Sequence, residues 1–330
     1  IQELESGKRV SEDKNKRNFS DFVLWFTKSK YEGHIMKWDS PWHEGYPGWH
    51  IECTAMSMKY LSDAFGKKFD PKKFETIDIH TGGEDNMFPH HECEIAQTEA
   101  ATGKRFSTFW MHVKHLIVEG KQMSKSMGNF YTLKDILGKG YDPMAVRYVL
   151  MSTHYRQQLN FTFDGLDAAK KSVEKMRDFM RRLKDMHGED NADMAIEAAT
   201  EKFEKAMDAD LHISVALAAV FDFMGEVNKL ELSKDEAKSA YDTMLKFDSV
   251  IGLRLEVKEE KLDEEIENLI KERESAKGKK DWATADEIRN KLKEQGIILE
   301  DTKEGVRWKK DESTEKSYLG YQEKSKHEKN

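Results

Sequence analysis

The stretch Asp78–Glu94, DIHTGGEDNMFPHHECE, decides the fold and holds the densest group of reactive side chains in the sequence. Pro89 suits the first turn of a helix, because its fixed φ is helical and its missing N–H is not needed there. His90 and Glu94 then lie four residues apart, on one face of that helix. An imidazole and a carboxylate are thereby predicted to point in the same direction.

A metal site is one interpretation of this pair. An imidazole nitrogen and a carboxylate on one helical face, joined by a thiolate from elsewhere, form a typical zinc ligand set. The nearest thiol is Cys53, in PGWHIEC. The alternatives are histidines that face solvent or cap the helix, and a cysteine that serves as a small buried apolar residue.

The glycines before the helix suggest a nucleotide site. Gly82, Gly83 and Asp85 follow an apolar segment that ends a predicted strand. Glycines allow a ligand to approach the backbone, and a following acid can accept hydrogen bonds from ribose hydroxyls. An ordinary Gly-Gly turn is the alternative.

The surrounding sequence predicts a βαβ unit with a parallel sheet. The predicted elements are a strand at Thr76–His80, a helix at Pro89–Ala101 and a strand at Met111–Val118. A further helix is expected over residues 50–66, with Cys53 near its start. Its apolar residues available for burial are Ile51, Met56, Met58, Tyr60 and Leu61.

Composition limits the class of protein. The chain has 330 residues, enough for two or three domains, and a net charge of −8, which argues against RNA binding driven by overall charge. It begins with Ile1 in a polar run, which suggests a missing front, and no stretch is long and apolar enough to span a membrane. Two cysteines form no disulfide framework, so we expect a reducing cytoplasm.

The two halves differ in composition. All five prolines and eight of the twelve histidines precede residue 144, so the front is rich in loops and chemistry while the back suits long helices. Two helical stripes are predicted to form a bundle core: Leu166, Val173, Met176, Phe179 and Met180, and Val215, Leu217, Val220, Phe221 and Met224. The tryptophans of the front are expected to be packing anchors: Trp25, Trp38, Trp42 and Trp49.

A loop at residues 121–130, KQMSKSMGNF, presents Lys125 between Ser124 and Ser126. Such a cluster of donors can bind phosphate, and the lysine can neutralise charge that develops on a triphosphate. Short Ser/Lys loops without this role are common, and that alternative remains open.

Residues 258–310 read as a small separate domain. Helices are predicted at 262–277 and 282–295, then strands at Gly296–Leu299 and Val306–Trp308 joined by a turn. Residues 311–330 are polar and are expected to be disordered.

Four further stretches accompany the opening one in a fixed order: DFVLW at 21–25, SPWHEGYPGWHIEC at 40–53, WMHVKHLIVEGKQMSKSMGNF at 110–130 and DWATADEIRNKLKEQGIILED at 281–301. Together they resemble the cysteinyl-tRNA synthetases, which are class I aminoacyl-tRNA synthetases. The resemblance implies an α/β fold: the carboxyl-terminal half of a Rossmann-like catalytic domain, an α-helical bundle and a small mixed α/β anticodon-binding domain. The implied divisions are the end of an insertion at 1–45, the catalytic half at 46–145, the bundle at 146–256, the anticodon domain at 257–310 and a tail at 311–330.

The resemblance also implies the reaction and its partners. ATP with Mg²⁺ activates L-cysteine to cysteinyl adenylate, and the cysteinyl group is transferred to the cysteine tRNA. One zinc ion per chain binds the sulfur of the substrate, which separates cysteine from serine better than shape alone can. We expect a cytoplasmic monomer without membrane contact.

Site residues follow from the family's motifs. The resemblance implies Cys53, His90 and Glu94 as zinc ligands, and Trp49 and His80 as substrate-pocket residues. Lys125 is the implied catalytic residue, and the implied ATP-binding residues are Lys125, His80, Gly82, Gly83 and Asp85. The signature loop KMSKS corresponds to Gln122, Met123, Ser124, Lys125 and Ser126. The implied anticodon contacts are Arg273, Lys277, Trp282, Asp286 and Asp301, of which Trp282 can stack on an unpaired base. Helix caps or packing roles are the alternative for each.

Some features depart from the family pattern. Gln122 replaces the first lysine of the signature loop, Thr81 replaces a usual glycine, and Cys93 stands where asparagine is usual. The family's amino-terminal cysteine ligand and histidine-rich ATP motif are absent from the sequence, so we expect no adenylate formation by residues 1–330 alone.

Two other interpretations remain. One is a truncated, non-catalytic protein that binds tRNA and zinc. The other is the related ligase that joins cysteine to an amino sugar, a family that lacks an anticodon domain.

Overall fold

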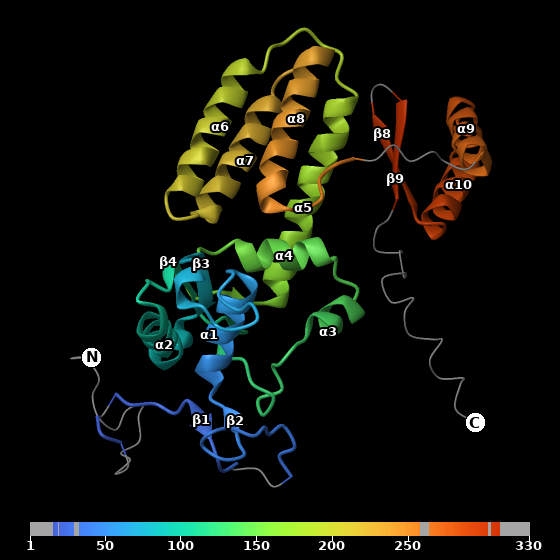
Figure 1. Cartoon of the computed structure of the whole chain (residues 1–330). Helices are drawn as coiled ribbons and strands as arrows, with labels where there is room; N and C mark the ends of the chain where they lie inside the picture. The colour runs from blue at the N-terminus through green and yellow to red at the C-terminus, as the bar shows by residue number, and fades with distance from the viewer. Residues whose placement is uncertain (1–15, 19, 30–32, 258–263, 303–304, 311–330) are drawn as a thin grey trace. The chain divides into compact units, whose positions relative to one another are not determined.

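The computed structural model describes residues 16–18, 20–29, 33–257, 264–302 and 305–310 (Figure 1). These residues form two compact units. The first contains the described residues up to His115 together with Tyr155–Gln158, and the second contains Leu116–His154 and the described residues from Leu159 onward. Among the described residues, no helix combines the length and the apolar character needed to cross a membrane.

A parallel βαβ arrangement forms the centre of the first unit. Strands β3 (Ile77–Gly83) and β4 (Ser107–Val113) pair in parallel, and helix α2 (Glu92–Thr102) connects them. In this register Ile79 lies opposite Phe109. The predicted parallel crossover, and with it the α/β class, is confirmed.

The predicted strand limits were wrong. β3 continues through Gly82 and Gly83, because the backbone there pairs with the end of β4, so the two glycines form no turn. β4 begins four residues before the predicted start at Met111, in a segment of β-favouring residues, and ends at Val113. Residues 117–118 form a separate strand in the second unit.

Helix α2 also begins later than predicted. Phe88 is extended, with φ −139° and ψ 131°, and interrupts a wide helical turn at Met87–His91. Helical backbone resumes at Pro89, but the regular α-helix starts at Glu92. It ends at Gly103, whose left-handed φ of 69° suits glycine.

Helix α1 (Trp49–Tyr60) is shorter than the predicted 50–66. Met58 is its buried apolar anchor and packs in a small core with Phe74 and Phe106. Three of the five residues expected to be available for burial are exposed, because the helix covers its core with only one narrow stripe: Met56, Tyr60 and Leu61.

The tryptophan prediction was largely wrong. Trp38, Trp42 and Trp49 are all exposed, at 49%, 63% and 60%. Among the described residues before α1, the named elements are the short antiparallel strands β1 (Trp25–Phe26) and β2 (Tyr46–Pro47), and none of those residues forms a helix that covers the rings.

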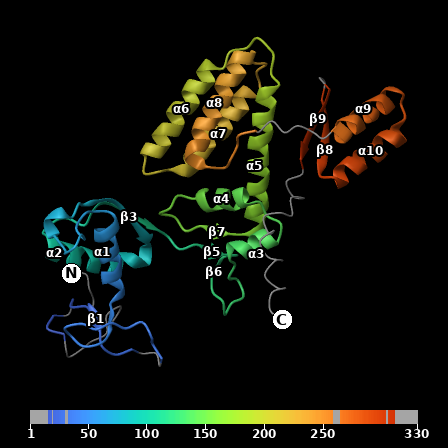
Figure 2. The ribbon, with the colours of Figure 1, turned by 45° about the vertical axis from the view of Figure 1, so that its right-hand side comes forward.

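The second unit begins with a small sheet beside two short helices (Figure 2). Strand β5 (Ile117–Val118) pairs with β6 (Lys121–Gln122) and with β7 (Asn160–Phe161). The helices are α3 (Leu133–Gly138), which starts with a Thr132 capping box, and α4 (Pro143–Met151), which Asp142 caps. Val118 and Ile136 share one core with Phe161.

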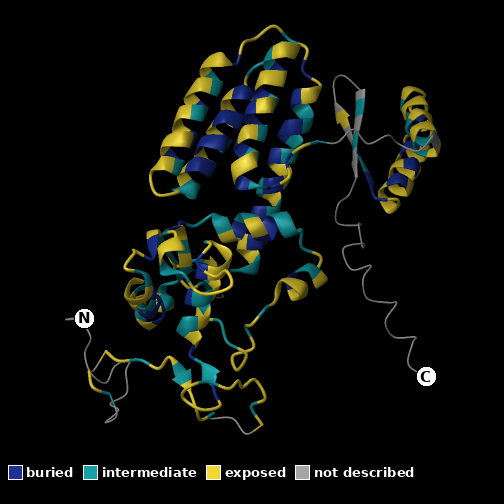
Figure 3. Cartoon of the chain, in the orientation of Figure 1, coloured by how far each residue is buried: buried dark blue, intermediate teal, exposed yellow. Residues whose placement is uncertain are grey.

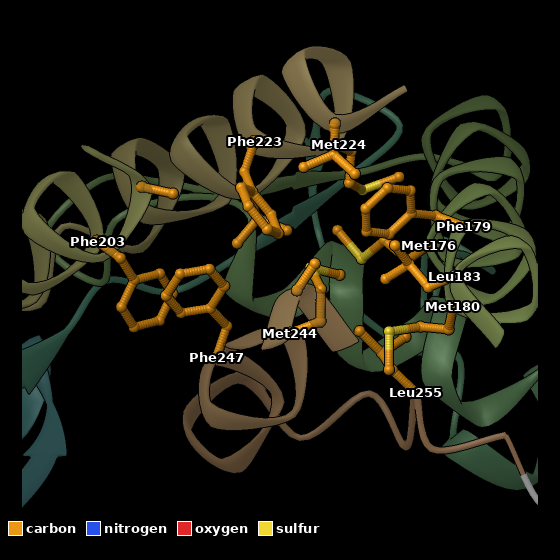
Figure 4. Packing of buried hydrophobic residues seen from close by; sticks show 14 of the residues in the cluster. Met176, Phe179, Met180, Leu183, Phe203, Phe223, Met224, Met244, Phe247 and Leu255 are labelled. Atoms are coloured by element: carbon orange, nitrogen blue, oxygen red, sulfur yellow. The ribbon is translucent and has the colours of Figure 1, made fainter. Parts of the chain in front are cut away.

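Four amphipathic helices follow and lie side by side with their buried faces turned inward (Figures 1 and 3). They are α5 (Phe163–Lys184), α6 (Asp193–Asp208), α7 (Ile213–Val227) and α8 (Lys234–Ile251). Figure 4 shows their shared core, where the rings of Phe203 and Phe247 stack at 4.6 Å. All five residues of the first predicted stripe are buried, but in the second Val215 is exposed and Phe221 is only half-buried.

The last elements match their prediction closely. They are α9 (Glu264–Gly278), α10 (Trp282–Glu294), β8 (Ile297–Thr302) and β9 (Gly305–Lys310), with the two strands forming an antiparallel hairpin. Ile288 and Leu292 of α10 pack in a core with Leu299 of the hairpin. The tail at 311–330, expected to be disordered, lies outside the described residues.

Candidate metal centre and nucleotide site

A buried carboxylate lies at the centre of the first unit. Glu94, in the first turn of α2, has no exposed surface, and neither of its oxygens makes a hydrogen bond. Its Oε2 lies 3.0 Å from Nε2 of His80, and its Oε1 lies 3.6 Å from Nε2 of His90. A buried carboxylate without hydrogen bonds is costly unless a cation compensates it.

A thiol completes the predicted ligand set. The ligand atoms of Cys53, His90 and Glu94 all lie within 4.8 Å of one another, as the helical spacing and the nearby α1 require. Burial raises the pKa of the Cys53 thiol, and the charges of Glu94 and Glu52 add to this effect. A bound cation would lower the pKa of the thiol and so oppose both effects. One sulfur, one nitrogen and one oxygen donor together fit zinc.

A second group shares the same carboxylate. His80, His91 and Glu94 also bring their ligand atoms within 4.8 Å of one another. Burial, and then the charge of His80, lowers the pKa of His91 to about 4, so its ring is neutral at physiological pH. Its Nδ1 lies 2.8 Å from Nε2 of His112, whose pKa burial also lowers.

Sequence reasoning did not identify His50, His91 or His112 as members of the site. His50 Nδ1 lies 2.7 Å from Nδ1 of His90, and the ring of Trp49 lies 4.2 Å from the ring of His90. The register that places Gly82 opposite His112 is a contact between strands that no local spacing reveals. Histidine enrichment before residue 144 was the only sequence signal for this cluster.

The glycines have distinct local roles. A Cβ at Gly82 would lie 2.7 Å from Cε1 of His91, so a side chain there would displace the histidine. Asp85 lies beyond Gly83, with its Oδ1 3.0 Å from Nε2 of His115. A hollow of about 590 Å³ is open beside them and is lined by Glu84, Asp85, Met87, Phe88 and His115. Its acidic and aromatic lining can accept the hydroxyls and ring of a nucleoside.

The signature loop belongs to the second unit. Asn129 holds it: its Oδ1 accepts from the Ser124 N–H at 2.9 Å, and its Nδ2 donates to the Gln122 carbonyl at 3.1 Å. Lys125 is exposed, its Nζ lies 5.5 Å from the Phe130 ring centroid, and no carboxylate of the described chain pairs with it. Its charge is thus available to an anion.

The predicted anticodon residues divide into two groups. Arg273, only 4% exposed, donates to both oxygens of Asp301 at 2.9 and 3.0 Å, and Lys277 donates to the same carboxylate at 2.8 Å. Trp282 is 60% exposed, and Asp286 is also exposed on α10. The first group holds α9 against β8, while the second is free to meet a ligand.

Comparison with known families matches three parts of the chain. A model described as tRNA synthetases class I (C) catalytic domain matches residues 1–171. A DALR domain matches residues 202–256, and a cysteinyl-tRNA ligase anticodon binding domain matches residues 259–308. The chain belongs to the class I cysteinyl-tRNA synthetases. The resemblance of the motifs is thereby confirmed.

Individual relatives agree. A cysteine–tRNA ligase of Protochlamydia amoebophila is 42% identical over 322 residues, which are 94% of this chain and 65% of the relative. One of Brachyspira hyodysenteriae is 43% identical over 321 residues, 92% of this chain and 64% of the relative. This member of the family therefore spans just under two thirds of the length of these relatives.

A solved structure supports the fold alone. The LeuRS–tRNA–LeuAMS complex of Agrobacterium radiobacter K84 matches with a TM-score of 0.52 and 16% identity, over 67% of this chain and 32% of that one. The α/β synthetase fold with its helical continuation is thus confirmed independently of sequence.

Proposed function

We propose that this chain is the part of a cysteine–tRNA ligase that holds the metal centre, the signature loop and the anticodon domain. The complete enzyme would activate L-cysteine with ATP and Mg²⁺ to cysteinyl adenylate and transfer the cysteinyl group to the cysteine tRNA. The observation that carries this proposal is the buried carboxylate of Glu94, whose oxygens accept no hydrogen bond and which lies beside Cys53 and His90 in a chain of this family.

Cys53, His90 and Glu94 would hold one zinc ion. Zinc, when bound, would supply a bond to the thiolate of the substrate that the hydroxyl of serine cannot replace. The protein contributes orientation, because α1 presents Cys53 while the first turn of α2 presents Glu94. It also contributes a site where Trp49 and His80 flank the histidine cluster and can shape the pocket of the amino acid.

Each unit contributes its own candidate residues for ATP contacts. Gly82 and Gly83 end strand β3 just before Asp85, which lines the open hollow and whose carboxylate can accept from the ribose hydroxyls. Lys125 would neutralise charge that develops on the triphosphate as pyrophosphate leaves, and the Ser124 and Ser126 hydroxyls can donate to phosphate oxygens. Met123 and Gln122 complete the loop, and we expect Gln122 to weaken ATP binding relative to a lysine there.

The cysteine tRNA would meet the carboxyl-terminal domain. Trp282 offers an exposed indole face for stacking and Asp286 an exposed acceptor for base edges. Arg273, Lys277 and Asp301 would shape this surface through their ion network. We expect a monomer, and a reducing cytoplasm fits the two free cysteines.

The test compares the chain with a completed enzyme. Residues 1–330 are expected to bind one zinc ion and the cysteine tRNA but to show no cysteine-dependent ATP–pyrophosphate exchange. Fusion behind the part of the Protochlamydia relative that this chain does not span should produce exchange with cysteine and not with serine. A fusion that folds and binds zinc but exchanges neither amino acid would contradict the proposal.

Non-catalytic tRNA binding is the second candidate, because the chain retains an anticodon domain while it spans only 65% of the first relative. The same fusion distinguishes the two candidates, because a protein that only binds tRNA would show no ATP–pyrophosphate exchange after fusion. The anticodon domain also counts against the amino-sugar ligase.

A further inference from the structure

The His90 ring is held on three sides. Its Nε2 points towards Glu94, with Oε1 at 3.6 Å. Its Nδ1 lies 2.7 Å from Nδ1 of His50, and the Trp49 ring covers it with an interplanar angle of 32°. The ring, at 5% exposed, can therefore use only Nε2 for a ligand beside Cys53.

Helix α1 supplies both His50 and the proposed ligand Cys53. His50 and Cys53 are three residues apart in its first turns, so they project from one face. Thr54 fixes the helix in place, because its hydroxyl donates to the Gln97 side-chain oxygen of α2 at 2.6 Å and lies 3.1 Å from the His50 carbonyl. The position of His50 is therefore set by the same contact that brings Cys53 to α2.

The contact between the two Nδ1 atoms determines where the protons lie. A hydrogen bond needs one donor and one acceptor, so only one of the two Nδ1 atoms carries a proton. If His90 is to offer the lone pair of Nε2 to a metal while neutral, its proton lies on Nδ1. His90 is then the donor, His50 Nδ1 is the acceptor, and the His50 proton lies on Nε2.

We propose that His50 is a positioning residue, whose Nδ1 accepts from the Nδ1–H of His90 and thereby holds His90 in the tautomer that binds a metal through Nε2. The inference rests on the proposed metal centre and goes beyond it, because it assigns a role to a histidine outside the ligand set. Histidine ligands commonly gain both orientation and basicity from such a partner.

The first test needs no metal. In the metal-free chain, ¹⁵N NMR at about pH 8 should show the His90 proton on Nδ1. The His50→Ala variant should move that proton to Nε2, the form that an isolated neutral imidazole prefers. The His50→Asn variant, whose side-chain oxygen can accept, should restore part of the Nδ1–H population. An unchanged His90 tautomer in His50→Ala would overturn the proposal.

The second test measures affinity with Co²⁺ as the probe, through its visible absorption and chelator competition. His50→Ala should weaken binding by about 10–100-fold while the thiolate charge-transfer band of Cys53 remains. The exposed His187→Ala, in the other unit, serves as the control and should bind as the parent does. If His50→Ala binds Co²⁺ as tightly as the parent does, the positioning role is refuted and the proposed metal centre is not. A parent chain that binds no Co²⁺ would refute both this role and the proposed metal centre.

Discussion

At the scale of single residues, Glu94 is completely buried, and neither of its carboxylate oxygens accepts a hydrogen bond. Gln is nearly isosteric and uncharged, so Glu94→Gln removes the charge without leaving a hole. Without metal, we expect the variant to be at least as stable as the parent. Its affinity for zinc should fall by more than the roughly 10–100-fold that is typical when a hydrogen-bond partner of a metal ligand is removed. Metal analysis after dialysis against a weak chelator measures this.

Glu92→Gln is the matched control, since Glu92 is an exposed carboxylate two residues earlier on the same helix. It should leave zinc content unchanged. If Glu94→Gln retains zinc as firmly as Glu92→Gln, the carboxylate is no ligand.

Only part of this site was predictable from sequence. The i,i+4 spacing of His90 and Glu94 is a property of any helix, so their convergence followed from the pattern. His50 and His112 reach the cluster through α1 and through the register of β3 and β4, which are contacts between distant segments. Spacing along the chain contains no information on such contacts.

At the scale of elements, an ion network joins α9 to β8. Arg273, and next Lys277, hold the pKa of the Asp301 carboxyl well below its ordinary value of 3.8. A lowered folded-state pKa means that the network stabilises the fold above about pH 4 and that this stabilisation is lost as the pH falls further. We expect the carboxyl-terminal domain to loosen on acidification before the helical bundle does.

Asp301→Asn should cost this domain about 1–2 kcal/mol at neutral pH, allowing for the exposure of the carboxylate, because buried Arg273 loses the carboxylate that accepts two of its hydrogen bonds. Hydrogen exchange of α9 and β8 peptides in the whole chain, corrected for the intrinsic effect of pH, measures both effects. The exposed Glu287→Gln of α10 is the control. If α9 and β8 lose protection from hydrogen exchange over the same pH range in Asp301→Asn and in the parent, another group controls the acid loosening of the domain.

Trp282 stands at the start of α10 with 60% of its surface exposed. A base that stacks on it should contribute about 1–3 kcal/mol. Trp282→Ala is therefore expected to weaken cysteine tRNA binding by about 10-fold or more without altering the unfolding of the domain. Trp42→Ala, which removes a 63% exposed indole from the other unit, should leave binding unchanged. Similar affinities of both variants in a filter-binding titration would exclude the stacking role.

Elements with local causes were predicted best. The predicted limits of α10, 282–295, differ from the observed ones by one residue, and in the structure Asp281 caps this helix. Both carboxyl-terminal strands followed from their turn. β3 and β4 were misplaced because each depends on its partner: Gly82 belongs to a strand only because His112 pairs with it. The glycines alone favoured a turn.

At the scale of the whole molecule, the two units differ in how well their apolar surfaces are covered. The four-helix core of the second unit is closed by its own periodic stripes, so sequence predicted it well. The first unit contains a two-stranded parallel sheet, and parallel sheets are normally covered on both faces.

One face of this sheet is left open by the described residues. Ile79 and Phe109 are register partners with 55% and 65% of their surface exposed, and Val113, four residues beyond Phe109 on the same face, is 46% exposed. His80 and Trp110, the next register pair, occupy the opposite face with α2. Since about a third of the Protochlamydia relative lies outside the matched part, we predict that the unmatched part of the catalytic domain covers the open face.

Complementation tests this prediction. The unmatched part of the Protochlamydia relative, expressed as a separate polypeptide, should co-purify with residues 1–330, because burying the face removes Ile79, Phe109 and Val113 from water. Phe109→Lys should reduce recovery about 10-fold or more by placing a charge in the contact. Met194→Lys, at an apolar position of α6 that is 85% exposed, controls for surface charge. Equal recovery with Phe109→Lys and Met194→Lys would place the contact elsewhere, and self-association through Phe109 would identify a second copy of the chain as the occupant.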